Sequence, residues 1–238
     1  MATWDTGFRH LLITGAGGGI GKAVLDLAAD SGGQVTAWDL PEVDVRDAEA
    51  VQQHLRKAVE ARGPVDALIH VAGVMEPDCA LEPEDNANFA VNFGGTVNVV
   101  APVARQMCQQ GSGAVVVVSS NAATTPRVGM ASYGASKAAV TAWTKTLALE
   151  CAPHGVRCNV VSPGSTRTPM LEGMWAPGAD ESAAVIAGNQ DTYRLGIPLG
   201  KLAQPQDVAA ACLFLISPAA GHITMHDMRV DGGATLDS

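Results

Sequence analysis

The chain has 238 residues, which suits one α/β domain, and 47% of them are hydrophobic. Its formal net charge of −9 argues against a nucleic-acid partner, because such a partner requires basic patches. No apolar run approaches the roughly 20 residues of a membrane helix, and no basic segment followed by an apolar one opens the sequence. We therefore expect a cytoplasmic protein with neither a nucleic-acid nor a membrane partner.

The five cysteines and six histidines show no spacing that is typical of a metal site. There is no CxxC pair and no HExxH pattern in the sequence. Scattered cysteines in an odd number predict reduced thiols rather than a disulfide framework. We expect no metal.

A run of glycines separates the first predicted strand, residues 8–14, from the first predicted helix, residues 22–29. Glycine permits close backbone approach, and the start of the helix offers unpaired N–H groups to a pyrophosphate. Turns also collect glycine, so the cluster gains its meaning from its place between a strand and a helix. It predicts a dinucleotide site at Gly15, Gly19, Ile20 and Gly21.

The second predicted strand, residues 34–38, is followed by Asp39, eighteen residues after Gly21. A carboxylate there can accept hydrogen bonds from the ribose hydroxyls and repels a 2′-phosphate. Residues 16–20 and 40–45 contain no basic side chain, which favours NAD over NADP. Asp44 and Val45 begin a short predicted third strand, and the Asp44 carboxylate is within reach of an adenine amino group. The alternative is that Asp39 merely ends its strand.

Strands and helices alternate along the remaining sequence. This alternation predicts a single doubly wound Rossmann-type α/β domain over residues 1–238, with a parallel sheet of about seven strands. Residues 169–200 lose the regular pattern, and we interpret them as a substrate lid. The remaining predicted helices are residues 47–61, 83–110, 132–151 and 205–216, and the remaining predicted strands are residues 66–71, 114–119, 156–161 and 228–230.

Tyr133 and Lys137 are four residues apart on a predicted helix and so share one face. An ammonium beside a phenol lowers the pKa of the tyrosine from about 10, which yields a proton acceptor. Ser120 follows a buried strand and is expected at the carboxyl edge of the sheet, where α/β sheets bind ligands. Asn92 lies in an apolar helix and requires a hydrogen-bond partner there; the alternative is that it caps a kink beside Gly94 and Gly95.

Taken together, these features resemble the short-chain dehydrogenase/reductase family along essentially the whole chain. The resemblance implies NAD as the cofactor and a homotetramer built on the helices that follow Pro83 and Ser132. One departure is visible: the family's Asn-Asn-Ala-Gly segment is His70-Val71-Ala72-Gly73 here. The implied catalytic residues are Asn92, Ser120, Tyr133 and Lys137. The implied cofactor contacts, besides those given above, are Ala72, Gly73, Tyr133, Lys137, Pro163, Gly164, Thr166 and Thr168.

Residues 125–130, 155–166, 195–201 and 231–236 resemble one branch of that family. This branch oxidises a ring hydroxyl of a cyclohexadiene carboxylate and gives an aromatic product. Its members imply that Tyr133 takes the hydroxyl proton, Lys137 lowers the tyrosine pKa, and Ser120 holds the substrate oxygen. Asn92 fixes a water in that scheme.

A carboxylate substrate needs a cation near Ser120. We expect Arg127 to bind it and Met130 to contact the ring, with Arg167 as a weaker candidate. Three alternatives stay open: a substrate with a 2-amino group in place of the 2-hydroxyl (a dihydro-3-hydroxyanthranilate), a 3-oxoacyl reductase, and a non-catalytic NAD sensor.

Overall fold

The computed structural model describes residues 6–236 of the chain. Residues 1–5, in which we expected no basic segment before an apolar one, lie outside the described range. Within that range, no helix combines the length and the apolar character that crossing a membrane requires.

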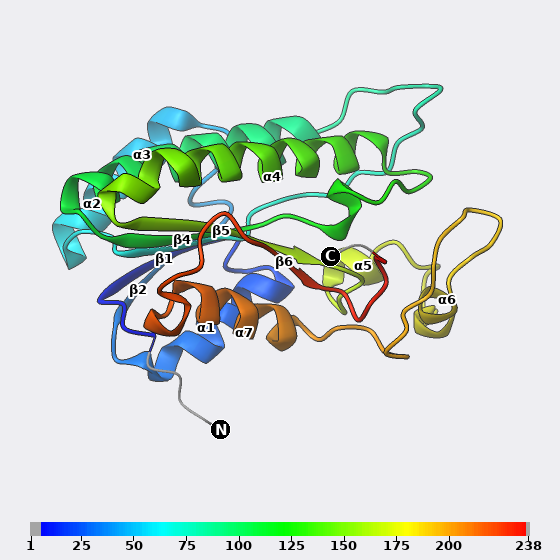
Figure 1. Cartoon of the computed structure of the whole chain (residues 1–238). Helices are drawn as coiled ribbons and strands as arrows, with labels where there is room; N and C mark the ends of the chain where they lie inside the picture. Colours follow the sequence, from blue (N-terminus) through cyan, green and yellow to red (C-terminus); the bar gives the residue numbers. More distant parts are fainter. Residues whose placement is uncertain (1–5, 237–238) are drawn as a thin grey trace.

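Six parallel strands form one sheet in the order β2-β1-β3-β4-β5-β6 (Figure 1). The chain runs outward from β1 to β2 and then returns to place β3 on the other side of β1. This reversal is the topological switch point at which α/β sheets open a crevice beyond their carboxyl ends. The strands are β1 His10–Thr14, β2 Gln34–Trp38, β3 Ala67–His70, β4 Gly113–Val118, β5 Val156–Pro163 and β6 Asp227–Val230.

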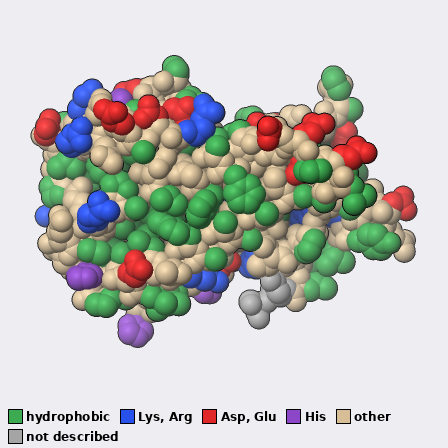
Figure 2. All heavy atoms as spheres, turned by 90° about the horizontal axis from the view of Figure 1, so that it is seen from above, with side chains coloured by type: hydrophobic (Ala, Val, Ile, Leu, Met, Phe, Trp, Pro, Cys, Tyr) green, Lys and Arg blue, Asp and Glu red, His purple; other side chains and the backbone are tan. Residues whose placement is uncertain are grey.

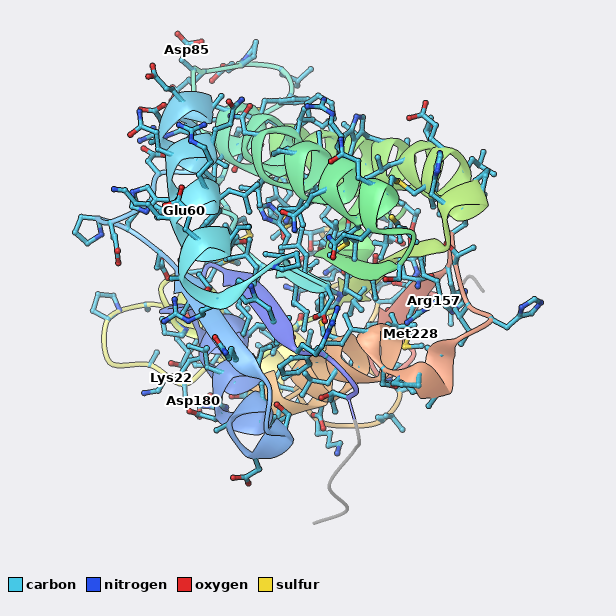
Figure 3. The ribbon with its side chains drawn as sticks, turned by 90° about the vertical axis from the view of Figure 1, so that its left-hand side faces the viewer. Lys22, Glu60, Asp85, Arg157, Asp180 and Met228 are labelled. Atoms are coloured by element: carbon cyan, nitrogen blue, oxygen red, sulfur yellow. The ribbon has the colours of Figure 1, made fainter. Side chains whose placement is uncertain are left out.

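Helices cover both faces of the sheet. Figure 1 shows α2, α3 and α4 above it and α1 and α7 below it, and Figure 3 shows the same layers from the side, with Glu60 on α2 and Lys22 on α1. The helices are α1 Gly19–Ala28, α2 Ala48–Arg62, α3 Gly95–Gln110, α4 Ala131–Cys151, α5 Pro169–Glu172, α6 Ser182–Ala187 and α7 Pro205–Ile216. Short helical turns are η1 Ala29–Ser31, the π-helical η2 Asn88–Gly94, η3 Asn121–Ala123, η4 Ala152–His154 and η5 Pro218–Ala220.

Local chemistry explains why these elements begin where they do. The Asp47 carboxylate accepts hydrogen bonds from the backbone N–H groups of Glu49 and Ala50 and so caps α2. Gln204 and Asp207 form a capping box around Pro205 at the first turn of α7. The valine run of β4 is buried from Ala114 to Val118, as expected for a central parallel strand.

The predicted third strand at Asp44 and Val45 is wrong: these residues lie in a loop, and the described sheet has six strands. The Asp44 carboxylate accepts a hydrogen bond from the backbone N–H of Arg46, which folds the chain into a turn. The Val45 carbonyl accepts a hydrogen bond from the Asn98 side chain of α3, so its backbone is tied to a helix rather than to a strand.

Candidate active site

A cavity of about 860 Å³ opens at the carboxyl ends of the strands. Its lining residues extend along the chain from Gly15, after β1, to Arg194, in the segment before α7. Of the 15 residues that we predicted to contact the cofactor, 14 line this cavity, and Gly21 is the exception. Ser120, Arg127 and Met130, the predicted substrate contacts, line it as well. The volume lies within the range of cofactor and small-molecule sites.

The glycine loop forms one wall of the cavity. Gly15 has a φ of +67°, and a Cβ atom there would lie 2.7 Å from the Ala72 nitrogen, so only glycine is accommodated. No side chain caps α1 at Gly18, which leaves the first amides of this helix free to bind an anion. Gly21 packs instead of lining the cavity, because a Cβ there would overlap the Gly15 carbonyl.

Two carboxylates flank the cavity at the end of β2. Asp39 accepts hydrogen bonds from the backbone N–H groups of Gly17 (2.5 Å) and Leu40 (2.7 Å). Asp44 forms an ion pair with Arg46, with a shortest N–O distance of 2.6 Å, and the Arg46 hydrogen bonds hold the pKa of Asp44 below its usual value. Arg46 also lines the cavity, at a position that was not predicted as a cofactor contact.

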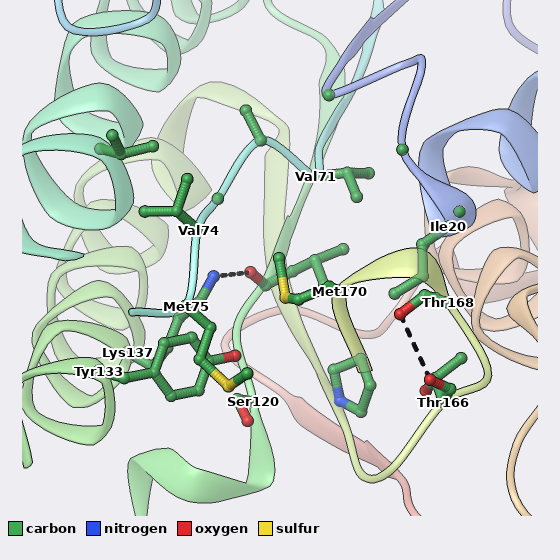
Figure 4. Close-up of a pocket in the computed structure, with 18 of the residues that line it drawn as sticks. Ile20, Val71, Val74, Met75, Ser120, Tyr133, Lys137, Thr166, Thr168 and Met170 are labelled. Atoms are coloured by element: carbon green, nitrogen blue, oxygen red, sulfur yellow. Dashed lines mark hydrogen bonds between the residues drawn. The ribbon is translucent and has the colours of Figure 1, made fainter. Parts of the chain in front are cut away.

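Ser120, Tyr133 and Lys137 meet in the cavity (Figure 4). Lys137 comes from α4 and donates a hydrogen bond from Nζ to the Val118 carbonyl at the end of β4 (3.0 Å). Tyr133, one turn earlier on α4, is hydrogen-bonded to Ser120. All three side chains are buried, and each is at most 9% exposed.

Burial governs the protonation of this group. It lowers the pKa of Lys137 to about 8. It raises the pKa of Tyr133 above its ordinary value, although the hydrogen bond with Ser120 and the charge of Arg127 oppose this rise. The expected lowering of the tyrosine pKa by Lys137 is therefore not found in the protein alone, where the lysine ammonium is directed to Val118.

Asn92 lies behind the cavity rather than in its lining. Its side chain accepts a hydrogen bond from the Val74 N–H (2.8 Å) and donates to the Val74 carbonyl and to Ser136 Oγ, both at 3.0 Å. It therefore ties the segment after β3 to α4, from the π-helical turn η2 that ends at Gly94. The water that we expect Asn92 to fix stays a prediction.

Arg127 reaches the cavity from the loop before α4. Its Nη2 donates a hydrogen bond to Asn121 Oδ1 (2.8 Å), and Asn121 in turn donates to the Asp231 carboxylate (3.2 Å). Burial, together with the nearby charge of Arg194, lowers the pKa of Arg127. Arg167, the weaker candidate, does not line this cavity and instead pairs with Glu172 and Asp180.

Arg194 is a second basic cavity residue, besides Arg46, that was not predicted from the sequence. It belongs to the predicted lid, from which Pro169, Met170, Leu171 and Met174 also line the cavity. Nothing in the local sequence marks this arginine; the one available signal was a cation inside a segment already interpreted as a lid. Within residues 6–236, no cluster of His, Cys, Asp and Glu could hold a metal ion.

Comparison with known proteins agrees with this geometry. A family profile described as "Enoyl-(Acyl carrier protein) reductase" matches residues 10–235. The 2,3-dihydro-2,3-dihydroxybenzoate dehydrogenase of Bacillus subtilis (strain 168) is 44% identical, over 94% of this chain and 95% of its own. The enzyme of the same description from Escherichia coli (strain K12) is 42% identical, over 98% and 99%. A solved structure titled "ElxO with NADP Bound" superposes with a TM-score of 0.82 at 26% identity, covering 97% of this chain and all of that one (100%).

The glycine loop, the crevice at the switch point and the Ser120, Tyr133 and Lys137 group define an oxidoreductase that uses a nicotinamide dinucleotide. The chain belongs to the short-chain dehydrogenase/reductase family.

Proposed function

We propose that this chain oxidises 2,3-dihydro-2,3-dihydroxybenzoate to 2,3-dihydroxybenzoate with NAD, a step that serves siderophore biosynthesis. The observation that carries the proposal is the position of Arg127. Its guanidinium shares one cavity with Tyr133 and Ser120, so a ring that carries a hydroxyl and a carboxylate has a partner for each group. Full-length identity to relatives described by this reaction supports it.

The residues of the chain divide the work of the reaction. Ser120 holds the substrate oxygen, and Tyr133, as the phenolate, takes the hydroxyl proton. Since burial disfavours the phenolate, the charge of Arg127 and the hydrogen bond from Ser120 are what offset that penalty within the protein. NAD, held by the glycine loop and Asp39, would supply the hydride acceptor. The ketone that results tautomerises to the aromatic catechol, which makes the reaction strongly downhill.

NAD, rather than NADP, is the cofactor that we propose. The Asp39 carboxylate would repel a 2′-phosphate, and it is already held in place by two backbone amides. Arg46 is the basic side chain in this part of the cavity, and its charge is compensated by Asp44. These two features favour a ribose with a free 2′-hydroxyl.

We further propose that the protein is cytoplasmic, that it assembles as a homotetramer, and that residues 169–200 form a substrate lid. For the compartment, the support is that all five cysteines are free thiols, which suits a reducing environment. For the assembly, the support is an apolar surface. Figure 2 shows hydrophobic side chains gathered on the face that the helices above the sheet cover in Figure 1. Phe89 on η2 and Leu149 on α4 are exposed. The lid residues that line the cavity support the proposed closing segment.

The decisive experiment assays three substrates with both cofactors. We expect the wild type to form a catechol from 2,3-dihydro-2,3-dihydroxybenzoate with NAD, and the Tyr133→Phe chain to lose at least about 1,000-fold in kcat while still binding NAD. Conversion of trans-2,3-dihydro-3-hydroxyanthranilate alone would assign the 2-amino substrate instead. Reduction of a 3-oxoacyl thioester with NADPH, or no turnover of any substrate, would overturn the proposal.

A further inference from the structure

A second guanidinium enters the cavity from the lid. Arg194 closes a tight hairpin with Asn189, in which each residue donates a backbone hydrogen bond to the other (2.9 and 2.8 Å). The neighbouring Tyr193 has a φ of +54° and is 90% exposed. Arg194 itself is half-buried and lines the cavity that holds Tyr133 and Lys137. The hairpin therefore directs Tyr193 to solvent and Arg194 into the cavity.

The base of this hairpin fixes its position. A Cβ atom at Gly188 would lie 2.5 Å from the Gly196 nitrogen, and one at Gly196 would lie 2.6 Å from the Ile186 carbonyl oxygen. Gly188 also has a φ of +80°. Ile197 donates a backbone hydrogen bond to Ile186 at the end of α6 (2.8 Å). Because the two legs are packed this closely, Arg194 is held against the cavity by the backbone.

The two arginines are anchored by neutral groups. Arg194 Nη2 donates a hydrogen bond to Ser165 Oγ (2.8 Å), just after β5, and Arg127 Nη2 donates to Asn121 Oδ1 (2.8 Å). Among the described residues, no carboxylate lies within 4.0 Å of either guanidinium. The Nε of Arg127 is buried and has no hydrogen-bond partner in the described part of the chain.

Besides burial, the charge of Arg194 lowers the pKa of Arg127, and an anion bound beside these two guanidinium groups would relieve that repulsion. The opposite charges that reach Arg127 come from Asp231 and from ionised Tyr133. Asp231 is itself occupied by the backbone N–H groups of Gly233 and Thr235 and by Asn121. A buried guanidinium with a free N–H is costly unless a ligand supplies the acceptor.

We infer that Arg194 and Arg127 together bind the substrate carboxylate, one from the lid and one from the loop before α4. The identity of this anion as a ring carboxylate rests on the proposed function. Guanidinium groups suit a carboxylate because each presents paired N–H donors in a planar fork. Arg194 is thus a specificity-determining residue that links acid recognition to the position of the lid.

The test compares Arg194→Gln with Lys201→Gln, which removes a cation from an exposed position at the end of the lid, outside the cavity. For Arg194→Gln we expect the KM of the dihydro acid to rise about 10- to 100-fold, with kcat within about threefold of the wild type. A cyclohexadiene diol without the carboxylate should be oxidised with unchanged kcat/KM. Arg194→Lys should recover part of the loss, and Lys201→Gln should show none. An unchanged KM in a chain that still binds NAD would overturn the inference.

Binding of 2-hydroxybenzoate, measured by calorimetry in the presence of NAD, separates this inference from the proposed function. We expect weaker binding in Arg194→Gln and in Arg127→Gln but not in Lys201→Gln. If the wild type binds 2-hydroxybenzoate in this way yet does not oxidise the dihydro acid, the proposed function fails and the carboxylate site stands. If it oxidises the dihydro acid and Arg194→Gln binds 2-hydroxybenzoate as tightly as the wild type, the carboxylate role of Arg194 fails alone.

Discussion

At the residue scale, Asp39 shows how a backbone can fix a charge for recognition. Both carboxylate oxygens accept hydrogen bonds from main-chain N–H groups, of Gly17 and Leu40, so the side chain cannot swing away from the cavity without losing them. A Cβ at Gly17 would lie 2.8 Å from this carboxylate, and glycine there lets the loop approach it. The negative charge is therefore a fixed feature of the cofactor site.

Replacing this carboxylate should change the cofactor preference. In Asp39→Ser we expect kcat/KM for NADP to rise and kcat/KM for NAD to fall, each by about 10-fold, because the repulsion of a 2′-phosphate and the ribose acceptor are both lost. The measurement is the ratio of the two kcat/KM values. The matched control is Asp47→Ser, which removes a nearby carboxylate that caps α2 and does not line the cavity. An unaltered ratio in Asp39→Ser would contradict the assignment of NAD.

Single residues also show how far the sequence alone could go. Ser120, Tyr133 and Lys137 were found because a strand end and a helical spacing place them at one sheet edge. Arg194 was not found, because its entry into the cavity depends on a hairpin with a positive φ at Tyr193. The hydrophobic periodicity of the sequence does not predict such a hairpin. The burial of the phenol, which raises the pKa of Tyr133 in the protein alone, could not be read from the sequence.

At the scale of elements, His70 joins β3 to β1. Its Nδ1 is 2.8 Å from the hydroxyl of Thr14, and that hydroxyl also accepts a hydrogen bond from the Ala72 N–H (3.4 Å). The buried Nε2 of His70 has no hydrogen-bond partner in the described part of the chain, so the histidine is tied to Thr14 through Nδ1. This bond ties two central strands at the point where the segment departs from the family's Asn-Asn-Ala-Gly.

The histidine should make the protein sensitive to acid. Burial, assisted by the charge of Lys137, lowers the pKa of His70 to about 3. Between pH 6.5 and about pH 3 the histidine is therefore protonated in the unfolded chain and neutral in the folded one, so acid favours unfolding. From pH 7 to pH 4.5 we expect the free energy of unfolding of the wild type to fall by about 3 kcal/mol more than that of His70→Asn. Urea titrations at both pH values measure this difference. His222→Asn, at an exposed position, is the control and should follow the wild type; parallel behaviour of His70→Asn would refute the effect.

Elements that depend on long-range contacts were the ones that sequence pattern misplaced. The alternation of apolar strands and amphipathic helices correctly indicated β1 to β6 and the main helices. It failed at Val45, a β-branched residue that is buried against Gly95 of α3, where a Cβ would lie 2.5 Å from the valine side chain. Burial against a helix and burial in a sheet leave the same apolar signature in so short a segment.

At the scale of the whole molecule, the site exists only when the sheet is assembled. The cavity takes residues from the loop after β1, from α4 and from the segment after β5, and no stretch of the chain contains the site by itself. The two buried clusters on the faces of the sheet pack the helices against the strands, and these elements carry the loops of the site. A ligand in the cavity therefore binds the folded chain and has no comparable site in the unfolded one.

It follows that NAD should stabilise the entire fold. At a concentration about 100 times its Kd, we expect NAD to add about 2.7 kcal/mol to the free energy of unfolding, which for a chain of this length raises Tm by roughly 5 to 10 °C. Calorimetry at one fixed protein concentration measures the shift, and equal concentrations of NADP should raise Tm less because of Asp39. In Asp39→Ser, NADP should raise Tm by as much as NAD or by more. Equal shifts by NAD and NADP in the wild type would show that the carboxylate at the end of β2 does not select the cofactor.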